Sequence, residues 1–544
     1  MINRSFLTAI ALVAVAIVAT SSRAETRTID VPADFARLVP ADAGVVAYIS
    51  DLGELQSSWL EMLPKAVRGE KSVMMPDLRT ELIKTSGKMD ADASILVWIG
   101  DLAELLPTAT TGVLHVAFRV PGGTSDNTSL IPGDPGWELV VADGMAIATH
   151  NLQDTKTPPP YTMPKQAGNP LLKDIPEGLV SWAVRGSDLG EVAKGVAPMA
   201  SMAPMMLQST LAERTQKMSA EDRKAVSKAQ QGLLRDISNL IGSAVSALED
   251  VTLMTGSVGI EGDGMTLHTH FSIGGEVAAD HGVDSRLISQ MPDGSALYAA
   301  FDAPTVKWIA DFEIDVLEAL FANNAASVAK FDSMMSEVKS AGTLIDGGYV
   351  LSMSDTSEVY TLIGCDQPKK LIAATEKIFD SMNAAEMGMT YTSTGKNAWD
   401  FQIDSTKMMS TLGMPEASGA AGGTPAGWSV TMTAGDQMVV IDQSPIENKA
   451  AQKPRKPQKS DTRAVFDKMK DTKIIFGISF DFMMLGEAAA ASMDLKDPPV
   501  PQVMRDMKTD VNVVLHSPDP KTVSLHLQMP MGVILGGPMM DAVK

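Results

Sequence analysis

The stretch Val39-Pro-Ala-Asp-Ala-Gly-Val-Val-Ala-Tyr-Ile-Ser-Asp-Leu-Gly-Glu-Leu55 combines a turn, a short apolar strand and the start of a helix. Proline, aspartate and glycine mark the turn, and the apolar run that follows is typical of a buried strand. The Asp-Leu-x-Glu at its end places an acid where it can cap the first turn of a helix. The stretch therefore predicts a strand followed directly by a helix.

The same order of turn, strand and helix start recurs along the chain. Residues 175–192 repeat it closely, residues 291–302 open in the same way, and residues 473–481 form a looser copy without the proline. A recurring order of this kind indicates internal repetition, which determines the whole architecture.

Two kinds of predicted hairpin also occur twice. Residues 136–149 and 427–441 both begin with Gly-Trp and alternate apolar and polar residues around a turn. Residues 257–271 and 512–529 are a second pair, each closing one half of the chain. Because four units recur in one order, we expect a duplication with its boundary near 274–290.

Helices with 3.6-residue periodicity separate these units. The longest predicted apolar stripe follows Ser219, a predicted N-cap, and consists of Val226, Leu233, Ile237, Leu240, Ile241, Val245 and Leu248. One-sided helices beside alternating strands predict an α+β fold of two tandem, internally duplicated halves. Each half is expected to be a mainly antiparallel sheet with helices packed on one face. We place the halves at 25–278 and 279–544, with a flexible insertion at 415–426 and a basic linker at 448–463.

The first 24 residues have the three parts of a secretory signal peptide. Arg4 supplies the positive charge, 6–19 form an apolar run, and Ser22-Arg23-Ala24 provides small residues at the cleavage site. We expect cleavage before Glu25 and an extracytoplasmic protein, periplasmic or secreted. Retention of the segment as a membrane anchor is the alternative.

Composition limits the possible partners. The 544 residues include 66 acidic and 45 basic side chains, which gives a net charge of −21. Such an acidic chain repels phosphate backbones, so nucleic-acid binding is not expected. The single cysteine, Cys365, excludes an intramolecular disulfide and any multi-cysteine metal site. No segment after the signal is apolar enough for a stable membrane span.

The chain resembles a loosely defined group of exported bacterial proteins of unknown function. The resemblance consists of Pro-x-Asp-Ala openings before a strand, as at 40–43, together with Asp-Leu helix starts and Gly-Trp hairpins. It covers most of the mature chain, but its motifs are short and structural. It implies an extracytoplasmic location and carries over no catalytic residues.

Two histidines are candidate metal ligands. His268 and His270 are separated by one residue, so both side chains lie on one face of a predicted strand. Zinc or copper could bind there with Glu261 or Asp263 as a further ligand. The duplicate hairpin keeps a histidine at the first position and has glutamine at the second. A polar strand face explains the same pattern without a metal.

Three methionines are candidate copper ligands. Met199, Met202 and Met205 recur at every third residue, and thioether sulfur selects Cu(I). Yet the chain contains 36 methionines throughout its length. Methionine is also a flexible filler of cores and a lining for adaptable apolar surfaces, which is the alternative interpretation.

Three Asp-Leu-x-Glu motifs offer acid pairs at Asp51, Asp101 and Asp188, each with a glutamate three residues later. Such pairs can serve acid–base catalysis, but helix capping explains their place after a strand. No known catalytic or cofactor motif occurs. We therefore expect a binding or scaffold protein without evident catalytic activity or cofactor. Its unknown partner would be a protein or an apolar ligand.

Two further classes of function remain open. One is a carrier that holds an apolar ligand between the sheet and the methionine-rich helices. The other is a metal-binding protein or an enzyme whose site assembles from residues far apart in sequence.

Overall fold

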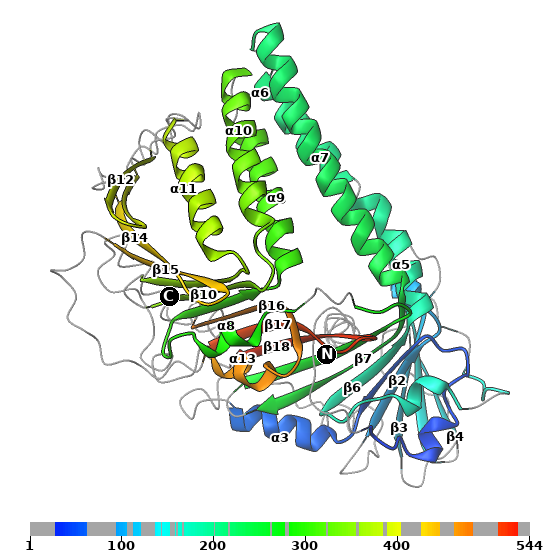
Figure 1. The fold of residues 1–544 in the computed structure, drawn as a ribbon. Coiled ribbons are helices and arrows are strands. Elements are labelled where there is room, and N and C mark those ends of the chain that lie inside the picture. Colours follow the sequence, from blue (N-terminus) through cyan, green and yellow to red (C-terminus); the bar gives the residue numbers. More distant parts are fainter. Residues whose placement is uncertain are drawn as a thin grey trace, which may run out of the picture. The chain divides into compact units, whose positions relative to one another are not determined.

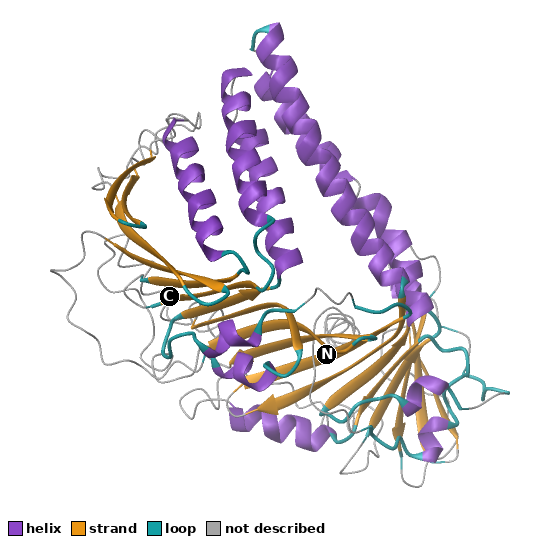
Figure 2. Cartoon of the chain, viewed as in Figure 1, coloured by secondary structure: helices purple, strands orange, loops and turns teal. Residues whose placement is uncertain are grey.

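The computed structural model describes residues 28–62, 94–105, 112–120, 137–142, 144–152, 158, 161–165, 168–200, 202–215, 218–261, 264–277, 282–321, 325–354, 358–384, 389–403, 426–445, 462–481 and 510–530. It has the predicted α+β fold, with helices and antiparallel strands in similar amounts (Figure 1, Figure 2). The predicted signal peptide lies outside the described residues. So do nearly all of the predicted insertion 415–426 and linker 448–463.

The chain divides into two compact units, which are described separately. Unit 1 comprises Met1–Ala197, Val245–Val277 and Pro499–Lys544, and unit 2 comprises Pro198–Ala244 and Ala278–Pro498. The units differ from the two sequence halves in two places. The segment Pro198–Ala244 belongs to the second unit, and the C-terminal segment Pro499–Lys544 belongs to the first.

Unit 1 is built on an antiparallel sheet. Its described pairings give the strand order β4-β5-β3-β2-β1-β6-β7-β8-β18-β17. The strands are β1 (Val45–Ile49), β2 (Ile95–Ile99), β3 (Val113–Arg119), β4 (Trp137–Ala142), β5 (Met145–Asn151), β6 (Val180–Arg185), β7 (Val251–Glu261), β8 (Gly264–Ile273), β17 (Asp510–Asp519) and β18 (Thr522–Pro530). The hairpin predicted to close the second half therefore continues the sheet of unit 1.

Both faces of this sheet are covered near its centre. Every residue of β1 and β2 is buried, because alternate side chains enter two separate apolar clusters. Leu52 of α3 (Leu52–Met62) and Leu189 of α5 (Gly186–Ala200) belong to one cluster. The other contains Phe35 of α2 (Ala33–Ala36) and Leu171 of η2 (Pro170–Lys173). The sequence pattern predicted helices on one face of the sheet only. The structure instead places helices against both faces.

Unit 2 is also built on antiparallel strands. Its described pairings give the order β16-β9-β10-β11-β15-β14-β13-β12. The strands are β9 (Leu297–Phe301), β10 (Gly348–Met353), β11 (Val359–Gly364), β12 (Met389–Gly395), β13 (Ala398–Ile403), β14 (Ala426–Ala434), β15 (Met438–Pro445) and β16 (Lys473–Asp481).

Longer helices accompany the strands of unit 2. They are α9 (Ala303–Phe321), α10 (Ala325–Gly342), α11 (Pro368–Ala384) and α6 (Met202–Thr215), with the shorter α8 (Ser285–Ser289) and α13 (Ala464–Met469). Leu371 and Ile372 of α11 pack against Trp399 and Val439 of the sheet. The 30-residue α7 (Ala220–Glu249) runs from unit 2 into unit 1 as one continuous helix.

Candidate functional site

The predicted histidine pair lies on β8, where a third histidine from β18 joins it. The two strands are antiparallel, with His526 directly opposite His268. The two rings meet edge to face, with centroids 5.4 Å apart. His270 Nδ1 lies 2.9 Å from Ser524 Oγ of the neighbouring strand. The strand register thus brings together imidazoles that the sequence places in two different hairpins.

These histidines belong to a buried polar face of the sheet in unit 1. The face comprises Thr255, Ser257, Thr266, His268, His270, Asn512, His516, Ser524 and His526. Asn512 Nδ2 donates a 2.9 Å hydrogen bond to Gln528 Oε1 within the face. Among the described residues, no group of three or more His, Cys, Asp or Glu side chains is placed to hold a metal ion. A structural zinc site takes four such ligands, so the described side chains do not assemble one.

The candidate copper methionines lie on two helices. Met199 is in α5, and its side chain is outside the described part of the structure. Met202 and Met205 are in α6, with 55% and 67% of their surfaces exposed. These two thioethers therefore face solvent and contribute apolar surface rather than core packing.

Further large apolar side chains are exposed on unit 2 helices. Trp308 of α9 is 47% exposed and Leu240 of α7 is 39% exposed. The predicted N-cap of α7 is present, because Asp222 N donates to Ser219 Oγ at 3.2 Å. The apolar stripe of this helix is buried only near its beginning, at Val226 and Leu233.

Two of the three Asp-Leu-x-Glu motifs cap helices. Asp51 Oδ1 accepts hydrogen bonds from Gly53 N at 2.7 Å and Glu54 N at 3.0 Å, at the start of α3. Asp101 Oδ1 accepts one from Ala103 N at 2.8 Å, at the start of the short helix η1 (Leu102–Leu105). The carboxylates satisfy N–H groups that have no partner within the helix.

Asp188 has a different environment, because it lies inside the first turn of α5 rather than before it. Its side chain is buried beside Gly44, where an added Cβ would clash with the carboxylate. Burial raises the pKa of Asp188, and the nearby charge of Asp101 adds to the shift. Burial likewise raises the pKa of Glu104. The acids of two motifs therefore converge at one end of β1, β2 and β6.

An aromatic cluster surrounds a fourth histidine. His115 stacks on Trp98 with ring centroids 5.0 Å apart, and Tyr161 meets both rings edge to face. Burial lowers the pKa of His115 to about 4, which keeps the imidazole neutral. Tyr161 donates a 2.6 Å hydrogen bond to the carbonyl of Leu38, and burial raises its pKa to about 12. This cluster anchors a loop on the sheet.

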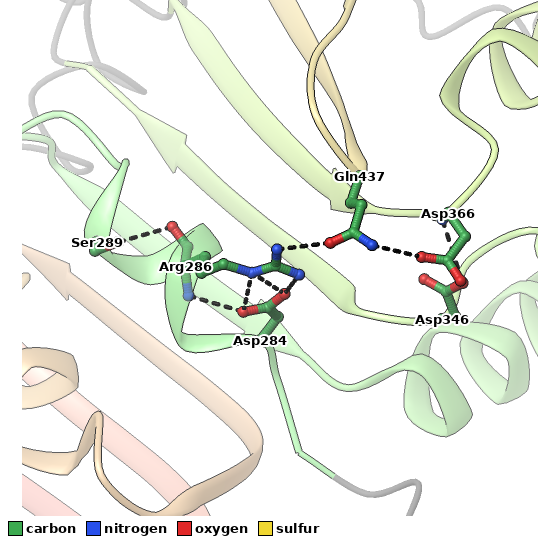
Figure 3. A network of polar contacts seen from close by, with 6 residues as sticks. All are labelled: Asp284, Arg286, Ser289, Asp346, Asp366 and Gln437. Atoms are coloured by element: carbon green, nitrogen blue, oxygen red, sulfur yellow. Dashed lines mark hydrogen bonds and ion pairs between the residues drawn. The ribbon is translucent and has the colours of Figure 1, made fainter.

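A polar network links a short helix of unit 2 to two of its loops (Figure 3). Arg286 donates to both carboxylate oxygens of Asp284 and, at 2.7 Å, to Gln437 Oε1. Gln437 Nε2 continues to Asp366 Oδ1 at 3.3 Å. The φ angle of Gln437 is 54°, a left-handed value that costs energy for a residue with a side chain. Gln437 lies in the turn between β14 and β15, and its hydrogen bonds to Arg286 and Asp366 help to hold that turn in place.

Cys365 is buried at the end of β11 beside this network. Burial raises the pKa of its thiol, and the charges of Asp346 and Asp366 add to the shift. A thiol in this state is a poor nucleophile, because thiolate is the reactive form.

Comparisons with known proteins give no relatives for this chain. No family model, no curated protein and no solved structure matches it. In the part of the chain that the structure describes, no helix combines the length and apolar character needed to span a membrane.

Proposed function

We propose that this chain is an exported, extracytoplasmic binding or scaffold protein that acts through apolar helix surfaces. The proposal rests on the positions of the large apolar side chains that are exposed. Of the five in the described residues, four lie on helices of unit 2, namely Met202, Met205, Leu240 and Trp308. Exposed apolar surface marks interaction sites, and methionine and aromatic residues are enriched in such interfaces.

Structural roles account for several of the polar groups described above, which supports this proposal. The carboxylates of Asp51 and Asp101 cap helices, and His115 is held neutral inside an aromatic cluster. General acid–base catalysis works best with a pKa near the working pH, and a histidine with a pKa of about 4 is far from that.

The binding proposal is tested by removing the exposed apolar groups of unit 2. The protein is isolated from its own cells in native form and as the Met202→Ser/Met205→Ser/Trp308→Ser variant. Copurifying molecules are then quantified by mass spectrometry. We expect at least one partner to be lost from the triple variant and retained by the control Met163→Ser, since Met163 is an exposed methionine in unit 1. An identical set of partners for all three proteins would refute the proposal.

The extracytoplasmic location is proposed from the signal sequence. We expect the mature chain to begin at or within a few residues of Glu25, which intact-mass measurement of the exported protein determines. A protein that retained residues 6–19 would contradict this part of the proposal.

We further infer that the two halves arose by duplication. If β9, β10, β11, β14, β15 and β16 correspond to β1–β6 in turn, the two sets of strands have the same order, and β12–β13 is an added hairpin. Equivalent turns support this correspondence. Val120 N donates to Gly144 O at 2.7 Å, and Cys365 N donates to Gln437 O at 3.0 Å, with positive φ at both acceptors.

The pairing of β8 with β18 also supports the duplication. His526 pairs with His268, Thr522 with Ser272 and Pro530 with Gly264, so the pairing is centred on the two histidines. These two histidines occupy equivalent positions in the hairpins β7–β8 and β17–β18. Residues paired with their own equivalents are the mark of a two-fold contact between like units.

A further inference from the structure

The segment 28–39, which precedes β1, is fastened to unit 1 from its first residue. Thr28 forms an isolated antiparallel bridge with Pro176. Ile29 N donates a 2.9 Å hydrogen bond to the carbonyl of Ile175, and the side chain of Ile29 packs against the second apolar cluster of the unit. The backbone of the segment is therefore held by main-chain contacts from its beginning.

Side chains further along the segment complete a core of unit 1. Phe35, Leu38 and Val39 are almost fully buried in the same cluster. Asp34 accepts two hydrogen bonds from the guanidinium of Arg119 in β3, at 2.9 and 3.1 Å, which lowers the pKa of Asp34. The same guanidinium lies 5.3 Å from the centre of the Phe35 ring. The segment is thus a part of the fold and not a free leader.

Unit 2 holds the segment before its own first strand in a similar way. Val283 N donates a 2.8 Å hydrogen bond to the carbonyl of Ile474 in β16, and Leu287 and Ile288 of α8 are buried. This segment lies in the middle of the chain, far from the predicted signal peptide. Docking of the segment before the first strand is therefore a feature of the fold, and in unit 1 it accompanies folding.

The docked segment of unit 1 begins very close to the expected cleavage site. Only Glu25, Thr26 and Arg27 separate the peptide bond after Ala24 from Thr28. Three residues span at most about 11 Å of fully extended chain. We propose that folding of unit 1 closes this bond to signal peptidase, so that cleavage has to precede docking of the segment. The inference rests on the signal peptide of the proposed function and adds the order of the two events.

The reaction is the hydrolysis of one peptide bond. The hydroxyl of a water molecule joins the carbonyl carbon of Ala24, and a proton of that water joins the nitrogen of Glu25. A bound peptide in extended conformation is recognised through its main-chain hydrogen-bonding groups. In the folded unit, Ile29 N already donates to Ile175. A docked chain is therefore cut only when it opens, and a chain that folded first would keep its signal peptide.

The test measures cleavage of the folded, full-length precursor in detergent micelles by purified bacterial signal peptidase. The native precursor is compared with a variant that carries about ten additional Gly and Ser residues after Arg27, a linker that spans about 18 Å on average. The insertion leaves every docked residue unchanged. We expect the native precursor to be cleaved at least about tenfold more slowly than the insertion variant, because only the native bond has to wait for opening of the segment.

Two point variants separate docking from general stability. Phe35→Ala removes the buried ring of the docked segment and should accelerate cleavage of the folded precursor. Leu189→Ala is the matched control, because it removes a buried side chain from the other apolar cluster of unit 1. Circular dichroism shows whether both variants are folded. If Phe35→Ala does not fold, the insertion variant alone decides the test.

Each outcome decides the inference. Slow cleavage of the native precursor and fast cleavage of the insertion variant support it. Equal rates for these two precursors, or equal acceleration by Phe35→Ala and Leu189→Ala, overturn it. A synthetic peptide of residues 12–31 separates this failure from failure of the proposed signal peptide, since the peptide has no unit to dock on. If signal peptidase leaves the peptide intact, the signal peptide is refuted and the inference falls with it. If the peptide is cut while the two precursors react equally, only the inference fails.

Discussion

Replacing Asp51 by alanine tests whether the Asp-Leu-x-Glu motif is a structural cap. The carboxylate accepts hydrogen bonds from two backbone N–H groups at the start of α3, at 2.7 and 3.0 Å. Loss of such a cap costs about 1 kcal/mol. Asp51→Asn keeps an acceptor oxygen and loses only the attraction of the charge to the helix dipole, which is roughly 0.3 kcal/mol at an exposed end.

Hydrogen–deuterium exchange of α3 measures this effect locally, which is needed because two units need not unfold together. A loss of about 1 kcal/mol should make the amides of Leu52–Met62 exchange about fivefold faster in Asp51→Ala. Asp51→Asn should stay within about twofold of the native chain. If both variants exchanged equally fast, the cap would not be the cause. If Asp51→Asn abolished binding of a copurifying partner at native exchange rates, Asp51 would be part of a binding site.

Four more substitutions test other parts of the structure. The ionised form of Asp188 is disfavoured in the fold, because burial raises the pKa of its carboxyl group above the ordinary range. The resulting destabilisation is present above the pKa of Asp188 in the folded state and disappears as the pH falls through that pKa. Asp188→Asn should therefore raise the melting temperature near neutral pH and hardly change it near pH 4. Gly256→Ala should cost about 1–3 kcal/mol in urea unfolding, because the new methyl group would clash with the carbonyl of His268 and the ring of Trp182. His268→Asn and His526→Asn should shift the urea midpoint by similar amounts, about 1 kcal/mol each, because both remove one shared ring contact. Very unequal shifts would count against their equivalence.

The sequence was sufficient to predict most individual elements. Residues 45–49, 180–185, 297–301 and 473–481 are strands, and the first three are followed by a helix within a few residues. The predicted hairpins also formed, since alternation and turn residues act over short distances. Ser219 and Asp51 cap their helices for the same reason, because a cap depends on groups within three residues.

Long-range pairing could not be read from the same patterns. The hairpin at 512–529 continues the sheet of unit 1 by pairing with β8. An edge strand has unpaired backbone N–H and C=O groups, and these can accept a strand from a distant part of the chain. The two Gly-Trp hairpins do not place their tryptophans at the same distance from the turn. Trp137 pairs with His150 near its turn, whereas Trp428 pairs with Pro445, two positions further from its turn. A shift of two keeps the same face outward, so the alternating pattern could not reveal it.

The candidate site shows the same limit. The sequence indicated His268 and His270 but could not show that His526 lies opposite them, since that depends on the register between two distant hairpins. It also assigned the stripe of α7 to a core, because periodicity predicts which residues share a face and not what covers that face.

The two halves of α7 show what distinguishes a buried face from one that remains available. Val226 and Leu233 are buried, although charged residues surround them in the sequence. Leu240 follows the same periodicity in a segment without charges, and it stays exposed. Charges around a core-facing stripe keep the rest of a helix in water and prevent unwanted contacts. No charged residue occurs from 237 to 248, so the exposed Leu240 lacks that protection.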